Sequence, residues 1–287
     1  MPLRYFILAF LSLFIFFHHV AFGKTTSTVQ KRLEADIVNG KPIVAHVIVA
    51  LCDNIHQGIV PVPKALGDGQ NPRTNLYWGA MYGFRTYFIR RAGYRLLVEK
   101  NNPNPGILQK VIFYKSIERS GIPRNVFIVG EAWDGKKMKD SINRFLRIAA
   151  GNDMESQKIR IDQREVDLSY GGMSALVGFV GHNGLMDFTL DSEPISRNGV
   201  PARSSVVLAC SSKPYFLDLL KRGGSHPLLL TTGLMAPEAY TLDAIIKAFV
   251  AGKPPSGIRD TASAAYHKYQ KCGLKAAKKL FVTNCTN

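Results

Sequence analysis

The sequence predicts an α/β protein with a mostly parallel, doubly wound sheet flanked by helices, and three observations lead to this prediction. Short apolar runs rich in Val, Ile and Leu recur along the chain, and such runs are typical of strands buried on both faces. Segments with helical spacing of apolar residues lie between them, an alternation that favours a parallel sheet. Of the 287 residues, 46% are hydrophobic and 20% are charged, which indicates a folded core and not a disordered chain.

Six apolar runs are expected to be strands, because each is too short for a helix that spans a domain. In chain order they cover residues 43–52, 94–98, 125–133, 174–182, 204–210 and 226–232. The first, IVAHVIVALC, is apolar at nearly every position, which indicates burial on both faces. His46 within it is expected to be a core histidine with satisfied hydrogen bonds.

Five segments between the strands are expected to be helices. They cover residues 76–91, 107–119, 136–150, 214–222 and 237–251. Asn75 is the expected N-cap of the first, whose aromatic residues recur at helical spacing and are assigned to core packing. The third carries an apolar stripe that begins at Met138, and it ends at Gly151. Pro237 begins the last.

The two ends of the chain are expected to lie outside the α/β domain. Near the N-terminus, Arg4 precedes an apolar stretch, and Ala21-Phe22-Gly23 stands where a signal peptidase would cut. The expected segments are a signal peptide (1–23), a leader that lies loosely on the surface (24–42), the α/β domain (43–258) and a basic C-terminal helix and tail (259–287). The protein is therefore expected to be secreted or periplasmic, with no transmembrane span after signal removal. An uncleaved N-terminal anchor is the alternative.

Export to an oxidising compartment makes disulfides possible for the four cysteines. Cys272 and Cys285 are close in sequence and are the candidates for a disulfide that holds the C-terminal tail. Cys52 and Cys210 stand at the ends of two different predicted strands. No Cys or His cluster has metal-ligand spacing and no phosphate-binding or dinucleotide motif occurs, so neither a metal nor a cofactor is expected.

The formal net charge of +16 favours contact with anionic surfaces or acidic substrates. The basic residues are spread along the chain, and the densest group falls in the C-terminal helical stretch. Its members are Lys268, Lys271, Lys275, Lys278 and Lys279. A solvated helix face explains this group better than a binding site, so a specific nucleic acid is not expected. The net charge alone makes an anionic surface a possible partner. A basic adaptor for nucleic acid or membrane rests on charge alone.

Two chemically able side chains end successive predicted strands. His182 follows the apolar run that begins near Ser174, and Cys210 follows V-V-L-A. Parallel strands of one sheet present their carboxyl ends at one edge, where open α/β sheets place their sites. A thiol and an imidazole brought together there make a nucleophile and its base. The loop of residues 53–74, rich in Gly and Pro, leaves the same edge and is expected to shape a substrate cleft.

The combination of a strand ending in G-H-N-G and a following strand ending in A-C-S resembles the caspase, legumain and gingipain group of cysteine peptidases, which share the caspase–hemoglobinase fold. The resemblance implies a caspase-like three-layer sandwich over residues 43–251. It implies that Cys210 is the nucleophile, that His182 is the acid or base, and that backbone N–H groups at Cys210 and just after His182 hold the oxyanion. Asn183 stands where these families usually have a small residue, which would shift that donor to Gly184.

The expected oxyanion and cleft residues are therefore Gly181, Asn183, Gly184, Asp53 and Asn54, and the expected partner is a peptide or protein substrate. Three alternatives remain open. The protein could be a non-catalytic envelope protein that uses the same cleft for an anionic ligand. A disulfide between Cys52 and Cys210 would abolish nucleophilicity. Cys52 with His56 is a second, poorer nucleophile and base.

Overall fold

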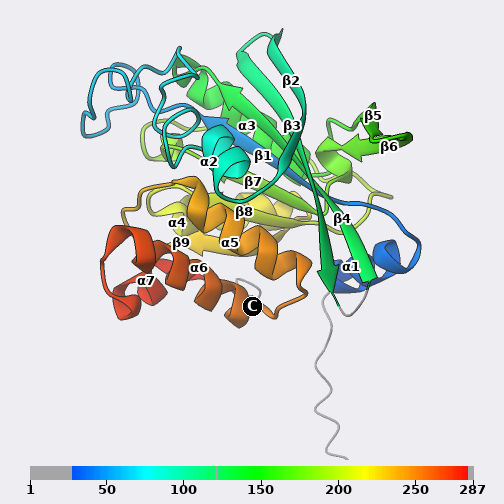
Figure 1. Cartoon of the computed structure of the whole chain (residues 1–287). Coiled ribbons are helices and arrows are strands. Elements are labelled where there is room, and N and C mark those ends of the chain that lie inside the picture. The colour runs from blue at the N-terminus through cyan, green and yellow to red at the C-terminus, as the bar shows by residue number, and fades with distance from the viewer. Residues whose placement is uncertain (1–27, 120–121, 284–287) are drawn as a thin grey trace, which may run out of the picture.

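The computed structural model describes residues 28–119 and 122–283, which contain an eight-stranded mixed sheet with helices on both faces (Figure 1). Its strands are β1 (Ile43–Ala50), β2 (Arg95–Asn104), β3 (Ile107–Arg119), β4 (Ile122–Trp133), β7 (Leu176–Val180), β8 (Ser204–Leu208), β9 (His226–Thr231) and β10 (Phe281–Val282). β5 (Glu155–Ile161) and β6 (Arg164–Tyr170) form a separate hairpin. The helices are α1 (Thr28–Val38), α2 (Phe84–Arg90), α3 (Met138–Ala149), α4 (Ser212–Arg222), α5 (Ala239–Val250), α6 (Pro255–Gln270) and α7 (Leu274–Leu280).

The strand order is β10-β9-β8-β7-β1-β4-β3-β2. The five central strands, from β9 to β4, run parallel, β3 and β2 continue the sheet antiparallel to β4, and β10 closes the other edge antiparallel to β9. The predicted α/β class with a large, mostly parallel sheet is thus confirmed. All five parallel strands deliver their carboxyl ends to one edge, which we call the carboxyl edge.

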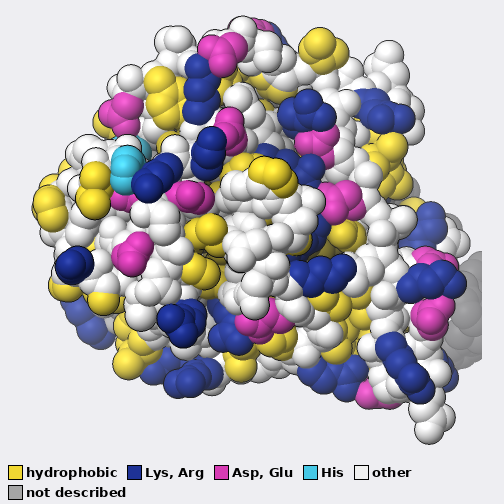
Figure 2. All heavy atoms as spheres, turned by 90° about the horizontal axis from the view of Figure 1, so that it is seen from above, with side chains coloured by type: hydrophobic (Ala, Val, Ile, Leu, Met, Phe, Trp, Pro, Cys, Tyr) yellow, Lys and Arg dark blue, Asp and Glu magenta, His cyan; other side chains and the backbone are white. Residues whose placement is uncertain are grey.

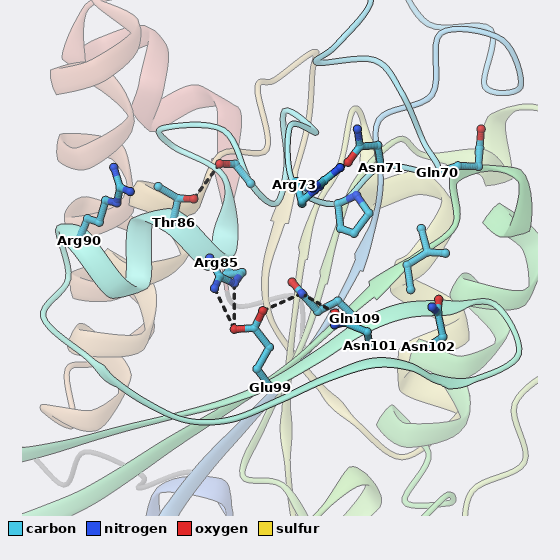
Figure 3. A pocket seen from close by; sticks show the side chains of 13 residues that line it. Gln70, Asn71, Arg73, Arg85, Thr86, Arg90, Glu99, Asn101, Asn102 and Gln109 are labelled. Atoms are coloured by element: carbon cyan, nitrogen blue, oxygen red, sulfur yellow. Dashed lines mark hydrogen bonds and ion pairs between the residues drawn. The ribbon is translucent and has the colours of Figure 1, made fainter.

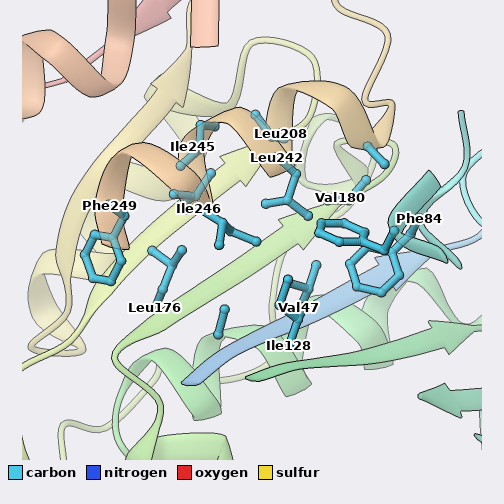
Figure 4. Close-up of a cluster of buried hydrophobic side chains, with 14 of the residues drawn as sticks. Val47, Phe84, Ile128, Leu176, Val180, Leu208, Leu242, Ile245, Ile246 and Phe249 are labelled. Carbon is cyan, nitrogen blue, oxygen red and sulfur yellow. The ribbon is translucent and has the colours of Figure 1, made fainter. Parts of the chain in front are cut away.

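Helices pack on both faces because the central strands are apolar on both sides. Every residue of β1, β7 and β8 is buried. On one face α5 contributes Leu242, Ile245 and Ile246 to a cluster with residues of the parallel strands (Figure 4). On the other face α3 and α4 contribute Phe145 and Phe216, which pack against Phe179 of β7. Burial of each such side chain stabilises the fold by about 1.5–3 kcal/mol.

Residues 107–119, expected to be a helix, form strand β3, and this expectation was wrong. β3 pairs with β4 along its length and with β2 on its other side. Val111, Ile112 and Phe113 are successive residues and are all fully buried, which a helix with one apolar face does not allow. The spacing of apolar residues here fits a helix as well as a strand, and the two neighbouring strands decide between them.

The helix expected over residues 76–91 is confined to α2, and turns occupy residues 75–83. Asn75 is not a helix cap. Its side-chain amide donates to the carbonyl oxygen of Cys52 (2.8 Å), and its Oδ1 accepts from the N–H groups of Cys52 and Tyr77. The polar atoms of this buried side chain thus bind the turns to the end of β1.

The segments expected on either side of the domain pack against it. Residues 28–38 form α1, not a loose leader: Val29 and Leu33 are buried, and the guanidinium of Arg32 donates to backbone carbonyl groups of distant segments. The C-terminal region begins inside α6 and also contains α7 and β10, and Tyr266 and Phe281 join the main core. The boundary expected at residue 258 is therefore not a structural one. The expected signal peptide lies outside the described residues, among which no helix could span a membrane.

Candidate functional site

His182 and Cys210 lie side by side at the carboxyl edge. β7 pairs in parallel with β8, Val180 stands opposite Leu208, and His182 and Cys210 are each the second residue after that pair. The backbone N–H of Gly181 continues the ladder by donating to the carbonyl oxygen of Leu208 (3.2 Å). The side chain of His182 is 13% exposed and Cys210 is half-buried, so both are within reach of a ligand at this edge.

Asn183 connects the loop after β7, which carries His182, to the loop after β8, which carries Cys210. Its side chain is fully buried, and its Nδ2 donates to the carbonyl oxygen of Cys210 (2.8 Å). Its Oδ1 is buried and accepts no hydrogen bond from the described residues. The side chain expected only to displace an oxyanion donor therefore sets the spacing between the two loops.

Asp187 holds the ring of His182. Its Oδ2 lies 2.6 Å from Nε2 of His182, and the short 3₁₀ turn Gly184–Met186 brings the two side chains together. Gly184 permits this turn because a Cβ there would lie 2.6 Å from Cγ of Met138. Asp187 was not among the site residues expected from the sequence. A carboxylate five positions after His182 is the signal that could have identified it.

The sulfur of Cys210 is surrounded by polar groups from distant segments. The backbone N–H of Met235, in the loop after β9, donates to Sγ at 3.4 Å. The pKa of Tyr77 is raised chiefly by burial and further by the neighbouring Cys52 and Cys210. Burial likewise raises the pKa of Tyr266, and its hydroxyl accepts a hydrogen bond from the N–H of Ala236. Neither tyrosine could be assigned to this site from the sequence.

The backbone N–H groups near the thiol divide into engaged and free donors. The N–H of Gly181 is engaged in the ladder, and that of Gly184 donates to the carbonyl oxygen of His182 (3.1 Å), so the expected shift of the oxyanion donor to Gly184 is not supported. The N–H groups of Asn183 and Cys210 donate to no residue in the described ranges. After Cys210, Ser211 takes a left-handed conformation (φ 45°) and α4 begins at once.

The two cleft residues expected at the end of β1 hold the 53–74 loop together. Asp53 is 1% exposed, and its carboxylate accepts from the N–H groups of Ile55 and His56 and from Nε2 of Gln70. Asn54 exchanges two hydrogen bonds with the backbone of Val62. The carboxylate of Asp53 is thus buried and bound by its own loop, which does not support its expected place among the cleft residues.

Cys52 is not bonded to Cys210, although both thiols lie near Tyr77. The two thiols are free in the structure. β7 separates the strands that carry them, which puts their backbones about 9–10 Å apart, beyond the roughly 7 Å that a disulfide spans. Burial raises the pKa of Cys52 to about 11, and His56 directs Nδ1 to Asp53 instead. These observations disfavour both the Cys52–Cys210 disulfide and the Cys52–His56 nucleophile.

A second group of charges is buried under α3, away from the carboxyl edge. Nε2 of His46 lies 3.1 Å from Oε1 of Glu131, and both side chains are fully buried. Arg144 and Lys110 also approach Glu131, at 3.0 and 3.6 Å. Nδ1 of His46 has no hydrogen-bond partner among the described residues. The expectation that all hydrogen bonds of this histidine are satisfied is therefore wrong. Burial lowers the pKa of His46, against the opposing effect of Glu131.

The remaining expectations concern cysteines, metals and charge. Cys272 is exposed and its candidate disulfide partner, Cys285, lies outside the described residues. Within residues 28–119 and 122–283 no cluster of His, Cys, Asp or Glu could hold a metal ion. Figure 2 shows Lys and Arg side chains scattered among acidic and apolar ones on the face in view, without a single basic patch.

Comparison of the chain with protein-family models, with curated proteins and with solved structures finds no match in any of the three.

Proposed function

We propose that the protein is a cysteine peptidase that acts outside the cytoplasm, with Cys210 as nucleophile and His182 as its acid and base. One observation carries the proposal: two adjacent parallel strands end with a half-buried thiol and an imidazole, and a carboxylate holds the imidazole at 2.6 Å. A nucleophile, a base and a group that orients the base are the parts that covalent acyl transfer requires. The resemblance to caspases and legumains supports a peptide bond as the bond cleaved.

The arrangement gives each group one task. Nε2 of His182 is engaged by Asp187, so Nδ1 is the nitrogen that takes the thiol proton. The N–H of Met235 donates to Sγ of Cys210, and the N-terminus of α4 follows Ser211, so both place partial positive charge near the sulfur. The thiolate attacks the peptide carbonyl carbon, and the unengaged N–H groups of Cys210 and Asn183 are the candidate donors to the oxyanion.

The cycle then balances with water alone. The tetrahedral intermediate expels the amine, which takes the proton from His182, and an acyl thioester remains on Cys210. Water attacks the thioester while His182 removes its proton, and the carboxylic acid leaves as the thiol is restored. No other reactant is needed.

The decisive experiment compares Cys210→Ala, His182→Ala and Cys52→Ala in hydrolysis of a fluorogenic peptide mixture, together with the pH dependence of iodoacetamide labelling at Cys210. The first two variants should lose hydrolysis while keeping the wild-type unfolding midpoint, and Cys52→Ala should keep hydrolysis. His182→Ala should shift labelling of Cys210 to higher pH. Hydrolysis that persists in both site variants would refute the proposal, and a non-catalytic binding protein for an anionic ligand would then be the better explanation.

A further inference from the structure

A cavity of about 680 Å³ lies between residues 70–79, α2 and the β2–β3 hairpin. Figure 3 shows that its labelled side chains come from these three segments and face a common space. Neither His182 nor Cys210 lines it. Its volume falls within the range of about 300–1,000 Å³ that is typical of small-molecule sites.

The charges of this cavity are unequal. Three arginines line it, Arg73, Arg85 and Arg90, against one acid, Glu99. Arg85 is paired with Glu99 at 2.8 Å. The guanidinium groups of Arg73 and Arg90 are exposed and have no ion pair or side-chain hydrogen bond with any described residue. The cavity therefore offers two positive groups whose charge the surrounding protein does not neutralise.

Hydrogen bonds fix several of the polar side chains that line the cavity. The indole N–H of the buried Trp78 donates to Oε1 of Gln109 (2.6 Å), and Nε2 of Gln109 donates to Oε1 of Glu99 (2.8 Å) and to Oδ1 of Asn101 (2.9 Å). Since Trp78 is fully buried, this chain of bonds fixes the wall to the core. Asn71 and Asn102 add further amide groups to the lining.

We propose that this cavity binds a small molecule carrying oxyanion groups, a phosphate or several carboxylates, through Arg73 and Arg90. The planar guanidinium fork matches the paired oxygens of either group and forms short, charge-assisted hydrogen bonds with them. The neighbouring amides supply donors for the remaining oxygens. This site is separate from the thiol and does not depend on the proposed peptidase function.

The test measures binding of two probes, pyrophosphate and citrate, by calorimetry and by the unfolding midpoint, with ionic strength held constant by sodium chloride. At least one probe should bind saturably and raise the midpoint. Arg73→Gln and Arg90→Gln should each weaken that binding at least about tenfold, because each removes charged hydrogen bonds. Arg197→Gln, which removes an exposed arginine outside the cavity, should bind like the wild type.

The results of the two probes distinguish a phosphate site, a polycarboxylate site and the absence of a site. Binding of pyrophosphate alone would identify a phosphate site, and binding of citrate alone a polycarboxylate site. Failure of both probes to bind would overturn the proposal, as would equal weakening by Arg197→Gln, since that result indicates general charge attraction. Because Arg73 and Arg90 are exposed, their variants should fold, and Arg90→Lys, which keeps the charge without the fork, should bind with intermediate affinity.

Discussion

Nε2 of His182 lies 2.6 Å from Oδ2 of Asp187, a side chain that is itself 53% exposed. The carboxylate thus fixes which nitrogen of the ring remains for proton transfer while staying in contact with solvent. In the proposed reaction Asp187 positions His182, since none of its contacts among the described residues is with the thiol.

Replacing Asp187 with Asn should lower the turnover number of peptide hydrolysis about 10- to 100-fold, less than the 10²–10⁴-fold of complete acid–base catalysis, because Asp187 is partly screened by water. Asp187→Glu should restore part of the activity, and the pH profile of hydrolysis should shift in the Asn variant. Asp191→Asn is the matched control, since Asp191 is exposed and pairs only with Lys139 among the described residues. Unchanged turnover and pH profile in Asp187→Asn would show that the bond is incidental.

Replacing Asn183 with Ala should destabilise the protein by about 1–3 kcal/mol, because it removes the hydrogen bond from a fully buried side chain to the carbonyl oxygen of Cys210. Denaturant unfolding measures the loss. In Asn152→Ala, the bond lost is exposed and joins Asn152 to the carbonyl oxygen of Ile195, so the change should stay within about 0.5 kcal/mol. Equal stability of the two variants would contradict the bridging role of Asn183.

The two buried or half-buried thiols at the carboxyl edge should differ in reactivity. Cys52 is fully buried and has a pKa of about 11, so at pH 8 it should resist iodoacetamide until the protein is unfolded. Cys210, half-buried beside the N–H of Met235, should be labelled in the native protein. Peptide mass spectrometry distinguishes the two. Native labelling of Cys52 at the rate of Cys210 would disprove this assignment.

Acid should destabilise the protein first through His46. Burial lowers the pKa of this side chain in the folded state, whereas the unfolded chain binds a proton below about pH 6.5. The unfolded state then holds more protons, so the free energy of unfolding falls as pH decreases from 6.5. Burial alone would raise the pKa of Glu131, but its bonds to His46 and Arg144 hold the pKa well below its usual range, which adds a further loss below about pH 4.5.

Urea unfolding at several pH values tests this order. In His46→Gln, the decline in stability between pH 6.5 and 5 should become shallower than in the wild type. His226, half-buried with a pKa lowered by burial, provides the comparison through His226→Gln. An unchanged slope in His46→Gln would mean that other groups carry the acid sensitivity.

The buried parallel strands were the part of the fold that the sequence predicted best. Uninterrupted Val, Ile and Leu runs leave little choice other than a strand with both faces covered, as in β1, β7 and β8. Residues 107–119 could not be resolved in this way, since pairing partners on either side decide their conformation. α1 was not predicted because it has only two buried apolar residues, Val29 and Leu33, among polar ones, so its sequence shows no clear helical period.

Of the candidate site, the sequence predicted the residues that stand at the ends of strands. His182 and Cys210 are found from the ends of two apolar runs. The bond from Asn183 to Cys210, the N–H of Met235 at the sulfur and the nearness of Tyr77 depend on how loops return over the edge, which no local pattern records. Asp53 was misassigned because loop position predicts proximity but not that its own loop occupies the carboxylate.

The two-residue strand β10 closes one edge of the eight-stranded sheet by pairing with β9. At the far edge, β2 carries Lys100 and Pro103, features that discourage strand addition. At the opposite edge, Phe281 and Val282 are the residues in the described part of the chain that pair with the outer side of β9, a strand with buried apolar residues. A chain that stops at Leu280 would expose that strand as a template, and it should form larger species in sedimentation while the full chain does not. Strand β10 is thus expected to protect the β9 edge of the sheet from pairing with another copy.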